Sequence, residues 1–405
     1  MSVLPEVLVP TPVIVDVVRL ASGKGKMGGA LSGTHPTSLL VHVLKAIVER
    51  NDLDPALVDD VITGCVMQAG EQALNIGRAG VLGAGFPESV PATTIDRACG
   101  SSQQAVHFAA QGVAAGAYDV VIAAGVESMS RVPMGSTTHG KDAMGPEVHA
   151  RYPEGLVHQG ISAELVAQKW KLDRAALDAY SAESHRRAAE AGAAGLFAKE
   201  IIPITVTDAD GNTREHTVDE TVRASTTAEG LGDLQPAFRT DELAARFPDI
   251  EWQIHPGNSS PFTDGASAAL IMSEEMASRL GLTPRARFAS YAVCGDDPLL
   301  MLTAPIPATQ KALVKAGLSI DDIDAYEVNE AFAPVPLAWA HDLGADPARL
   351  NPWGGAIALG HALGSSGTRL LATLVNHLEA TGGRYGLQTM CEANGMANAT
   401  VIERI

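Results

Sequence analysis

Cysteine is scarce in this chain, and no two of its cysteines form a CxxC pair; they are Cys65, Cys99, Cys294 and Cys391. Single cysteines that lie far apart do not suit a disulfide framework, nor a structural zinc site, whose ligands come in close pairs. We therefore expect reduced thiols, as in the cytoplasm.

Long hydrophobic runs are also missing, since no stretch approaches the roughly 20 apolar residues that a membrane-spanning helix needs. Residues Met1–Pro12 contain no basic stretch followed by an apolar core, so they do not predict a signal peptide. The chain ends in Glu403-Arg404-Ile405, which is not a peroxisomal address. These absences predict a cytoplasmic protein without a membrane partner.

Positive charge is the third shortage, because 29 lysines and arginines stand against 47 aspartates and glutamates, a formal net charge of -18. Such a chain repels the phosphates of nucleic acids and of anionic membranes, so neither is an expected partner. A small ligand that carries phosphate is still possible, because a local group of lysines and arginines can bind it. Aromatic residues make up only 4%, but 40 glycines suit an α/β protein with many tight turns.

Strand and helix patterns alternate through the first 130 residues of this 405-residue chain, which is long enough for two or three domains. The predicted strands are Val13–Val18, Val61–Val66, Ala92–Arg97 and Val120–Ala124. The predicted helices are Thr37–Arg50, Ile76–Leu82 and Ser101–Ala117. This βαβαβαβ order is typical of a mostly parallel sheet covered by helices.

A similar rhythm returns later, with predicted strands at Ser267–Met272, Arg287–Val293, Ile323–Val328, near Leu350, Gly386–Met390 and Ala399–Glu403. The helices predicted there are Thr309–Ala316, Ala331–His341 and Gly364–Ala380. Between the two parts, only Ile161–Trp170 and Asp173–Ala191 are clearly helical, and the length of this segment favours ligand-binding loops. We predict a duplicated α/β fold: an N-terminal half (1–129 and 260–274), an inserted loop domain (130–259) and a C-terminal half (275–405).

Four segments combine a reactive side chain with small residues at a turn. The first, Thr94–Gln103, places Cys99 where a strand ends and a helix begins. Because the N–H groups and dipole of a helix start favour a thiolate, Cys99 is a candidate nucleophile. A buried structural cysteine is the competing interpretation, and this segment alone does not decide between them. Cys65, in an apolar strand, is expected in the core, and Cys294 is assigned no role.

The other three segments surround Asn329, His361 and Cys391. Asn329 precedes a predicted helix, where it would hold a water or an oxyanion, or only cap the helix. His361 lies in a turn with five glycines, Gly354–Gly367, and suits a base that removes a thiol proton. A phosphate loop would need a lysine that is missing here, and a buried histidine bound to the backbone is the plainer alternative. Cys391 is a candidate proton donor or acceptor.

In this order and at this spacing, the four segments resemble the thiolase family, and the likeness runs from Val13 to Ile405. It includes Gly-Glu-Gln at 70–72 and the stretch Val126–Ser130. The resemblance implies the thiolase fold, with two βαβαβαββ halves of mixed sheets covered by helices and an inserted loop domain. It implies an acyltransferase of fatty acid and lipid metabolism. Such an enzyme cleaves a 3-ketoacyl-CoA into acetyl-CoA and a shortened acyl-CoA, or runs the reverse condensation, by a ping-pong route.

The resemblance also implies roles for the catalytic residues. Cys99 would carry the acyl group as a thioester, and His361 would activate its thiol. Cys391 would move the proton at the α-carbon of acetyl-CoA. Asn329, through a water, would share one oxyanion hole with His361, and the backbone N–H groups of Cys99 and Ala393 would form a second.

Substrate contacts follow from three further likenesses. His158, in Val157–Glu164, would contact the substrate beside the acyl thioester. Ser260, in Gly257–Ser260, would lie against the pantetheine. Arg223 falls where the family can place an arginine that binds CoA. CoA enters as a substrate, and the resemblance implies no permanently bound cofactor or metal, and a homodimer or homotetramer.

The chain departs from the family pattern at a few positions. Ala362 replaces the usual proline after the histidine, and Ala393 and Asn394 replace glycines of the usual Cys-x-Gly-Gly-Gly. Asn394 tolerates unusual backbone angles better than most residues. Asp233 and Gln235 stand where basic residues are frequent, which predicts weaker contacts with CoA phosphates.

Two other classes share parts of this pattern. A ketosynthase-type condensing enzyme would need a second motif histidine in place of Cys391 and Asn329. A non-catalytic acyl-CoA or lipid carrier should have lost Cys99 or His361. The residues leave open whether the acyl chain is short, long and fatty, or ring-bearing, and in which direction the reaction runs.

Overall fold

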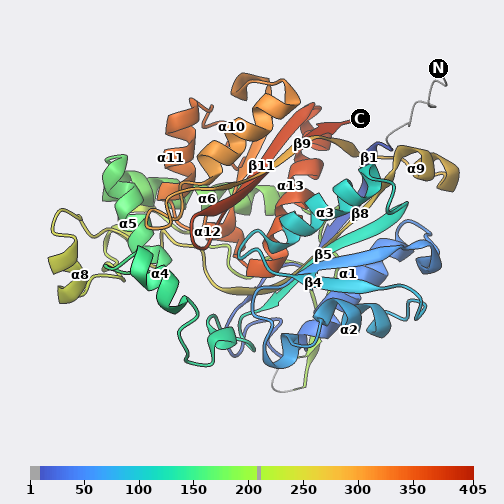
Figure 1. Cartoon of the computed structure of the whole chain (residues 1–405), viewed down its shortest axis with the longest axis horizontal. Coiled ribbons are helices and arrows are strands. Elements are labelled where there is room, and N and C mark those ends of the chain that lie inside the picture. The colour runs from blue at the N-terminus through green and yellow to red at the C-terminus, as the bar shows by residue number, and fades with distance from the viewer. Residues whose placement is uncertain (1–9, 208–210) are drawn as a thin grey trace.

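The computed structural model describes residues 10–207 and 211–405, so most of Met1–Pro12, where no signal peptide is expected, lies outside it. Its main feature is a ten-stranded mixed sheet in the order β10-β11-β12-β9-β1-β8-β5-β3-β4, with β2 paired to β8. Only two residue pairs join β1 to β9, so the sheet consists of two parts that meet there. Most elements of the C-terminal part lie above α1, α2 and β4 of the N-terminal part in Figure 1.

The N-terminal part contains parallel strands β3, β4 and β5, and antiparallel β8 and β1. Its strands are β1 (Pro12–Arg19), β2 (Gly23–Lys24), β3 (Asp60–Gly64), β4 (Ala92–Ile95), β5 (Val120–Ser128) and β8 (Thr263–Ser273). Its helices are α1 (Pro36–Glu49), α2 (Ile76–Gly83), α3 (Ser101–Ala114) and α9 (Glu274–Leu280).

The C-terminal part repeats this plan, with β10 parallel to β11 and antiparallel pairs β11–β12 and β12–β9. Its strands are β9 (Ala286–Gly295), β10 (Ala325–Val328), β11 (Tyr385–Glu392) and β12 (Met396–Arg404). Its helices are α10 (Pro305–Ala316), α11 (Pro334–Leu343), α12 (Ala356–Leu359) and α13 (Ser366–Thr381). The predicted duplicated α/β fold is confirmed.

Alternating side chains along the strands separate two cores. Val13 and Val15 of β1 pack with α1 and α2, whereas Ile14 between them packs with α3 and α13, as the two-residue period of a strand requires. A register shift between Ile14 and Asp16 then places Val17 on the same side as Ile14. The helices α3 and α13 share this second core with strands of both parts. The starts of these two central helices are therefore the natural place for groups from both halves to meet.

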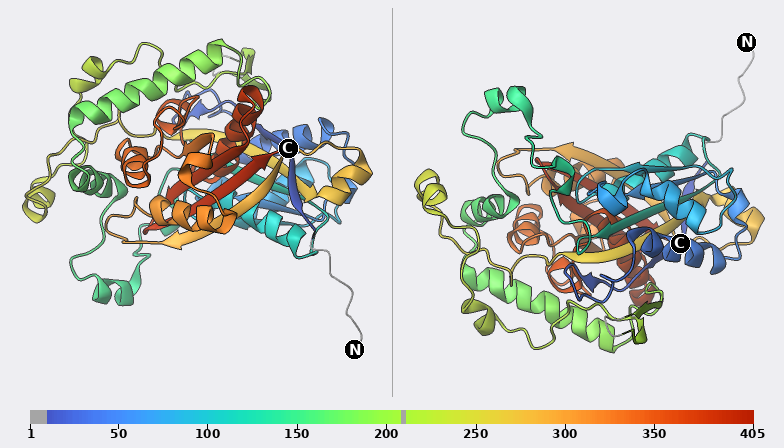
Figure 2. Two further views of the ribbon diagram at one scale, coloured as in Figure 1. Left: turned by 90° about the horizontal axis from the view of Figure 1, so that it is seen from above. Right: turned by 90° about the horizontal axis from the view of Figure 1, so that it is seen from below.

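The segment between β5 and β8 lies mainly outside the sheet, on the left of Figure 1. It contains α4 (Gly145–Arg151), α5 (Gln159–Lys169), α6 (Arg174–Ala193), α7 (Ala228–Gly232), α8 (Asp241–Arg246) and the hairpin β6 (Ile204–Thr207)–β7 (Thr213–His216). The long helix α6 runs along the outside of the molecule in both views of Figure 2. Within the described residues, no helix is both long and apolar enough to span a membrane.

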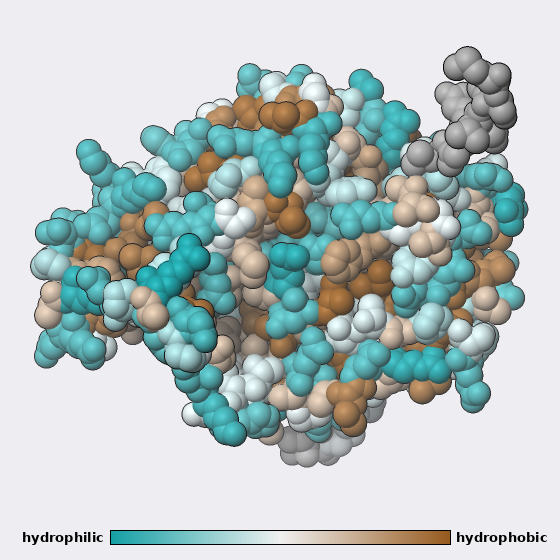
Figure 3. Space-filling view, viewed as in Figure 1, coloured by the Kyte–Doolittle hydropathy of each residue, from teal (hydrophilic) through white to brown (hydrophobic). Residues whose placement is uncertain are grey.

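One predicted element is wrong. Leu350 forms a single β-bridge with Tyr326 and not a strand. Pro352 follows two residues later and has no N–H to continue a ladder, so the pairing stops at one bridge. Elsewhere the predicted strands and helices match the structure within a few residues. On the face drawn in Figure 3, hydrophilic residues surround scattered hydrophobic ones.

Candidate active site

Cys99 lies in the turn between β4 and α3, which short hydrogen bonds hold in place. Ala98 has a φ of +45°, a left-handed conformation that costs an L-residue about 1–2 kcal/mol. Its N–H donates to Oδ1 of Asp96 (2.7 Å), and its carbonyl accepts from Oγ of Ser101 (2.6 Å). The N–H of Arg97 donates to the same Oγ (2.9 Å). This strained turn fixes Cys99 at the start of α3, with 8% of its surface exposed.

The thiol of Cys99 is neutral in the resting site. Burial raises its pKa well above the ordinary value, and Cys391 and Glu392 raise it further. The start of α3 favours a thiolate, but these effects outweigh it. A base must therefore take the proton when Cys99 reacts.

His361 is positioned by the turn between α12 and α13, where Gly360 has a φ of +85°. Its Nδ1 lies 2.6 Å from Oγ of Ser366, and this hydroxyl donates to the carbonyl of Ala362 (2.8 Å). A hydroxyl has only one proton to donate, so Nδ1–H of His361 must be the donor in the first bond. Nε2 then carries the free lone pair, and it is buried without a hydrogen-bond partner among the described residues.

The ring of His361 is neutral as well. Burial, and after it the positive charge of Arg369, lower its pKa to about 3. Its ring makes no hydrogen bond to the backbone within the described part of the chain. The geometry is that of a neutral imidazole with one nitrogen anchored and the other available to accept a proton.

Glycines allow the turns that carry the cysteine and the histidine to approach each other. A Cβ at Gly367 would overlap the backbone N of Gln103, and one at Gly125 would overlap the carbonyl of Gly364. The starts of α3 and α13 thus touch through backbone atoms, an approach that only glycine permits.

Glu127, near the end of β5 and within the stretch Val126–Ser130 of the family likeness, connects these turns. Its Oε2 accepts from the N–H groups of Val66 and Gly364 (both 2.9 Å). Its Oε1 accepts from Gln72 (2.7 Å) and from the N–H of Met67 (3.1 Å). This buried carboxylate connects three loops around the site. The sequence pointed to the stretch but not to this role, because the partners come from three distant segments.

Asn329 follows β10 directly and is 1% exposed. Helix α11 starts at Pro334 with Ala333 as its N-cap, so Asn329 does not cap this helix. Its N–H donates to the carbonyl of Thr389 (3.0 Å), which ties it to the strand of Cys391. Its Oδ1 and Nδ2 are both buried without partners among the residues described. The amide is thus free to bind a ligand.

Glu330 anchors the Asn329 segment. Its Oε1 accepts from Tyr180 (2.8 Å) and Asn351 (2.9 Å), and its Oε2 accepts from Ser184 (2.7 Å) and from the N–H of Ile357 (3.0 Å). It therefore joins the segment to α6 and to the glycine-rich turn. Apart from the motif itself, no local sequence pattern indicates this function of Glu330.

Cys391 lies near the end of β11 and is 1% exposed. Burial, followed by the charge of Glu392, raises its pKa to about 12. It packs with Phe332 and Ile357, whereas Cys99 packs with Met390 on the other side of the strand. The two thiols are close enough for Cys391 to raise the pKa of Cys99.

The turn after Cys391 accommodates the two departures from glycine. Asn394 and Gly395 take positive φ values (61° and 79°), which Asn-Gly pairs adopt readily in hairpins. Ala393 is not among the residues with positive φ, so its Cβ is compatible with the turn.

The other predicted contact residues, His158, Ser260 and Arg223, differ in how they connect to the surroundings of the four motif residues. His158 caps α5 and stacks on Phe238 (5.6 Å between ring centroids), which in turn packs on Phe332 (6.2 Å). The N–H of Ser260 donates to the carbonyl of Ala331 (3.0 Å), beside Asn329. Arg223 is exposed, and its N–H donates to His185 (3.2 Å). Within the described residues, no hydrogen bond links Arg223 to the catalytic groups.

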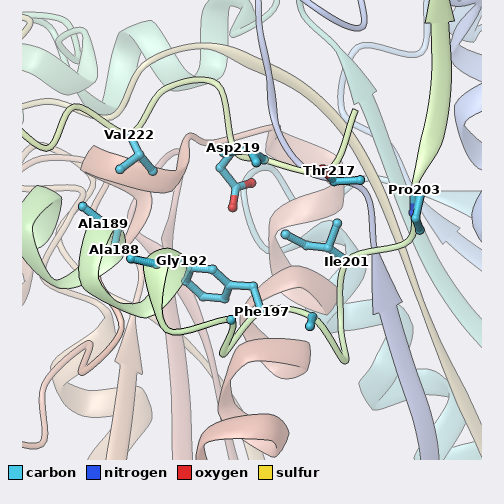
Figure 4. Close-up of a pocket in the computed structure, with 13 residues that line it drawn as sticks. Ala188, Ala189, Gly192, Phe197, Ile201, Pro203, Thr217, Asp219 and Val222 are labelled. Atoms are coloured by element: carbon cyan, nitrogen blue, oxygen red, sulfur yellow. The ribbon is translucent and has the colours of Figure 1, made fainter. Parts of the chain in front are cut away.

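The cavity of about 520 Å³ in Figure 4 is a separate feature. It lies between the end of α6 and the segment 217–222, and Phe197, Ile201 and Val222 give it apolar walls. None of the four motif residues lines it. Within the described residues, no group of three or more His, Cys, Asp or Glu side chains is placed to hold a metal ion.

Two family models match nearly the whole chain: the thiolase N-terminal domain over residues 12–275 and the thiolase C-terminal domain over residues 282–404. A steroid 3-ketoacyl-CoA thiolase from Mycobacterium tuberculosis is 47% identical over 97% of this chain and 94% of its own length. A 3-ketoacyl-CoA thiolase from Cronobacter sakazakii is 43% identical over 97% of this chain and 99% of its own.

A solved structure supports the same assignment. The acetyl-CoA acetyltransferase from Bacillus anthracis superposes with a TM-score of 0.88 at 34% identity, covering 98% of this chain and 99% of that chain. Sequence, fold and the match of both domains agree, so the chain belongs to the thiolase family and is an acyltransferase with thiolase activity.

Proposed function

We propose that this thiolase cleaves 3-ketoacyl-CoA with CoA through a thioester on Cys99, in a ping-pong reaction. The observation that carries the proposal is the state of His361. Its Nδ1 is anchored by Ser366, and its Nε2 is buried, unprotonated and without a hydrogen-bond partner in the described part of the chain. Such a nitrogen is available to take a thiol proton, and the thiol of Cys99 needs a base because it is neutral at rest.

In the first half-reaction, His361 takes the proton of Cys99, and the sulfur attacks the 3-keto carbon. The bond between C2 and C3 breaks, and its electron pair leaves as the enolate of acetyl-CoA. Cys391 gives its proton to the α-carbon, so acetyl-CoA departs and the shortened acyl group stays on Cys99. The raised pKa of Cys391, about 12, keeps this proton in place until the enolate forms.

In the second half-reaction, the proton held by His361 returns to the Cys391 thiolate, and His361 then takes the proton of an incoming CoA. The CoA sulfur attacks the thioester, and Cys99 leaves and recovers its proton from His361. Both halves place negative charge on a thioester or ketone oxygen. Asn329, with a water and His361, would stabilise one such oxygen, and the N–H groups of Cys99 and Ala393 would stabilise the other. The unpartnered amide of Asn329 supports the first assignment.

The segment 130–259 would carry the CoA contacts, between an N-terminal half (1–129 with 260–274) and a C-terminal half (275–405). His158 and Ser260 would border the acyl and pantetheine groups, since the packing of Phe238 and the Ser260–Ala331 bond bring them toward the centre. Arg223 would reach the CoA from the surface. The enzyme would work in the cytoplasm as a homodimer or homotetramer, with no other bound cofactor.

We further propose a ring-bearing acyl chain as the substrate, in the degradative direction, because the 47% identical relative is a steroid 3-ketoacyl-CoA thiolase. The test measures CoA-dependent cleavage of acetoacetyl-CoA, a long fatty 3-ketoacyl-CoA and a steroid-side-chain 3-ketoacyl-CoA. Higher kcat/KM for the steroid thioester would support this choice, and a preference for acetoacetyl-CoA would refute it. Mass spectrometry after incubation with acetyl-CoA tests the route, since the acetyl group should be found on Cys99.

A further inference from the structure

Glu392 is a buried acidic side chain for which the proposed reaction has no use. It follows Cys391 on β11 and is 1% exposed. Neither Oε1 nor Oε2 has a hydrogen-bond partner among the described residues. A negative charge in such surroundings is strongly disfavoured unless it is paired, so the geometry selects the neutral acid.

The carboxyl group of Glu392 lies against the backbone beside the nucleophile. Consecutive side chains of a strand face opposite sides, so Glu392 faces away from the side of Cys391. A Cβ at Gly100 would overlap Oε1 of Glu392 and would lie 2.8 Å from Oδ1 of Asn398. The acid and the amide oxygen therefore meet at the residue that follows Cys99.

Asn398 has its amide oriented by other partners. Its Nδ2 donates to Oε1 of Gln104 (3.2 Å) and to Nδ1 of His107 (3.2 Å). Nε2 of His107 then donates to Oγ1 of Thr400 (2.7 Å). With both Nδ2 protons used, Oδ1 is an acceptor, and it has no donor among the described residues. The O–H of a neutral Glu392 is the donor that lies beside it.

The charged and titratable neighbours of Glu392 come from three elements. Burial is the largest effect and raises its pKa to about 9, with Arg97 opposing and Asp96 adding to the rise. On α3, His107 is neutral, since burial lowers its pKa to about 3. Charge on Glu392 would in turn raise the pKa of Cys99 and of Cys391.

We propose that Glu392 is a positioning residue of this thiolase: as a neutral acid it donates to Asn398 and places no negative charge beside the two cysteines. The inference rests on the proposed roles of Cys99 and Cys391. It predicts that the thiol reactivity of Cys99 rises less steeply at alkaline pH, once Glu392 ionises, than that of an isolated thiol.

The experiment compares the whole enzyme with Glu392→Gln, which keeps the shape and a donor but cannot ionise. Alkylation of Cys99 by iodoacetamide is followed between pH 7 and pH 10.5 by mass spectrometry, with acetylation by acetyl-CoA as a second readout. The two proteins should react within about twofold at pH 7. At pH 10 Glu392→Gln should be alkylated about tenfold faster, which is the effect of one unit in the pKa of Cys99.

Asn398→Ala is a second variant with the opposite expected effect. It removes the acceptor of the neutral acid and so lowers the pKa of Glu392, and the flattening of the alkaline rise in reactivity should begin about one pH unit lower than in the parent. If Glu392→Gln fails to fold, as judged by circular dichroism, the comparison of Asn398→Ala with the parent still tests the role of Glu392. The same pH dependence in parent and variants would overturn the role of Glu392 alone, and so would loss of acetylation by Glu392→Gln at pH 7. Failure of the parent to acetylate Cys99 would overturn the proposed function and this inference together.

Discussion

Ser366 is the residue on which the base function of His361 depends most directly. Its hydroxyl donates to the carbonyl of Ala362 and accepts from Nδ1–H of His361 at 2.6 Å. This pair of bonds sets the tautomer that leaves Nε2 with its lone pair. Ser366→Ala removes the acceptor and nothing larger than one oxygen atom.

The size of the effect of Ser366→Ala on the acylation rate follows from the burial of the His361 ring. His361 is 4% exposed, so the Nδ1–H of the variant would be left unsatisfied in the productive tautomer, at a cost of about 1–3 kcal/mol. The other tautomer, with its proton on Nε2, avoids this cost and cannot accept a proton from the thiol. We expect acylation of Cys99 to slow by roughly 5- to 150-fold, the range that this free energy spans.

The assay is single-turnover acetylation of Cys99 by acetyl-CoA, quenched on the millisecond scale and read by mass spectrometry. Ser365→Ala is the matched control, because Ser365 is an adjacent buried serine that contacts Ser267 and not His361. The control should acetylate close to the parent rate. Acetylation by Ser366→Ala at the parent rate would refute the tautomer argument.

Three further predictions concern neighbouring residues. Cys391→Ser, with a hydroxyl that is a far weaker acid than a thiol, should slow acetoacetyl-CoA cleavage about 100-fold or more while acetylation of Cys99 survives; cleavage at the parent rate would contradict this. Ala362→Pro should raise the free energy of unfolding in urea by about 0.4–1 kcal/mol, because φ of Ala362 is already -77° and its N–H donates to no acceptor within the described residues. A fall in the free energy of unfolding would show that the proline ring does not fit. Glu392→Gln should gain stability relative to the parent by about 1.4 kcal/mol per pH unit as pH rises from about 6 to 8. The reason is that the parent acid, with a folded pKa of about 9, ionises only on unfolding in that range, so its stabilising effect is lost as pH rises; a pH-independent difference would show that Glu392 is already charged in the folded state.

The periodic segments of the fold could be predicted because each carries its own local signal. The β-branched run that forms β1 and the amphipathic pattern that forms α1 need no distant partner to be recognised. The turns at Cys99 and His361 also have local signals, since small residues and glycines mark a close backbone approach. The structure adds that the starts of α3 and α13 touch, which depends on how these helices pack against both parts of the sheet and on no single segment.

The electrostatic state of the site could not be predicted in this way. A helix start indicates a thiolate at Cys99, but burial and two neighbours from β11 outweigh it. Glu392 reads as an ordinary hydrophilic residue of a hairpin until β12 and α3 are seen to bury it. The partners of Glu127 and Glu330 likewise come from segments far apart in sequence.

A site built from neutral groups explains why the protein needs so many anchored polar atoms. Cys99, His361 and Cys391 all titrate so as to be uncharged at neutral pH. Proton transfer from Cys99 to His361 then creates a thiolate and an imidazolium together, and their mutual attraction is strong where water is excluded. The pair forms only when a substrate carbonyl is ready to consume the thiolate, so an idle enzyme exposes no reactive sulfur. A fixed carboxylate beside Cys99 would disfavour that thiolate, which is why the protonation of Glu392 matters to a reaction in which it takes no covalent part.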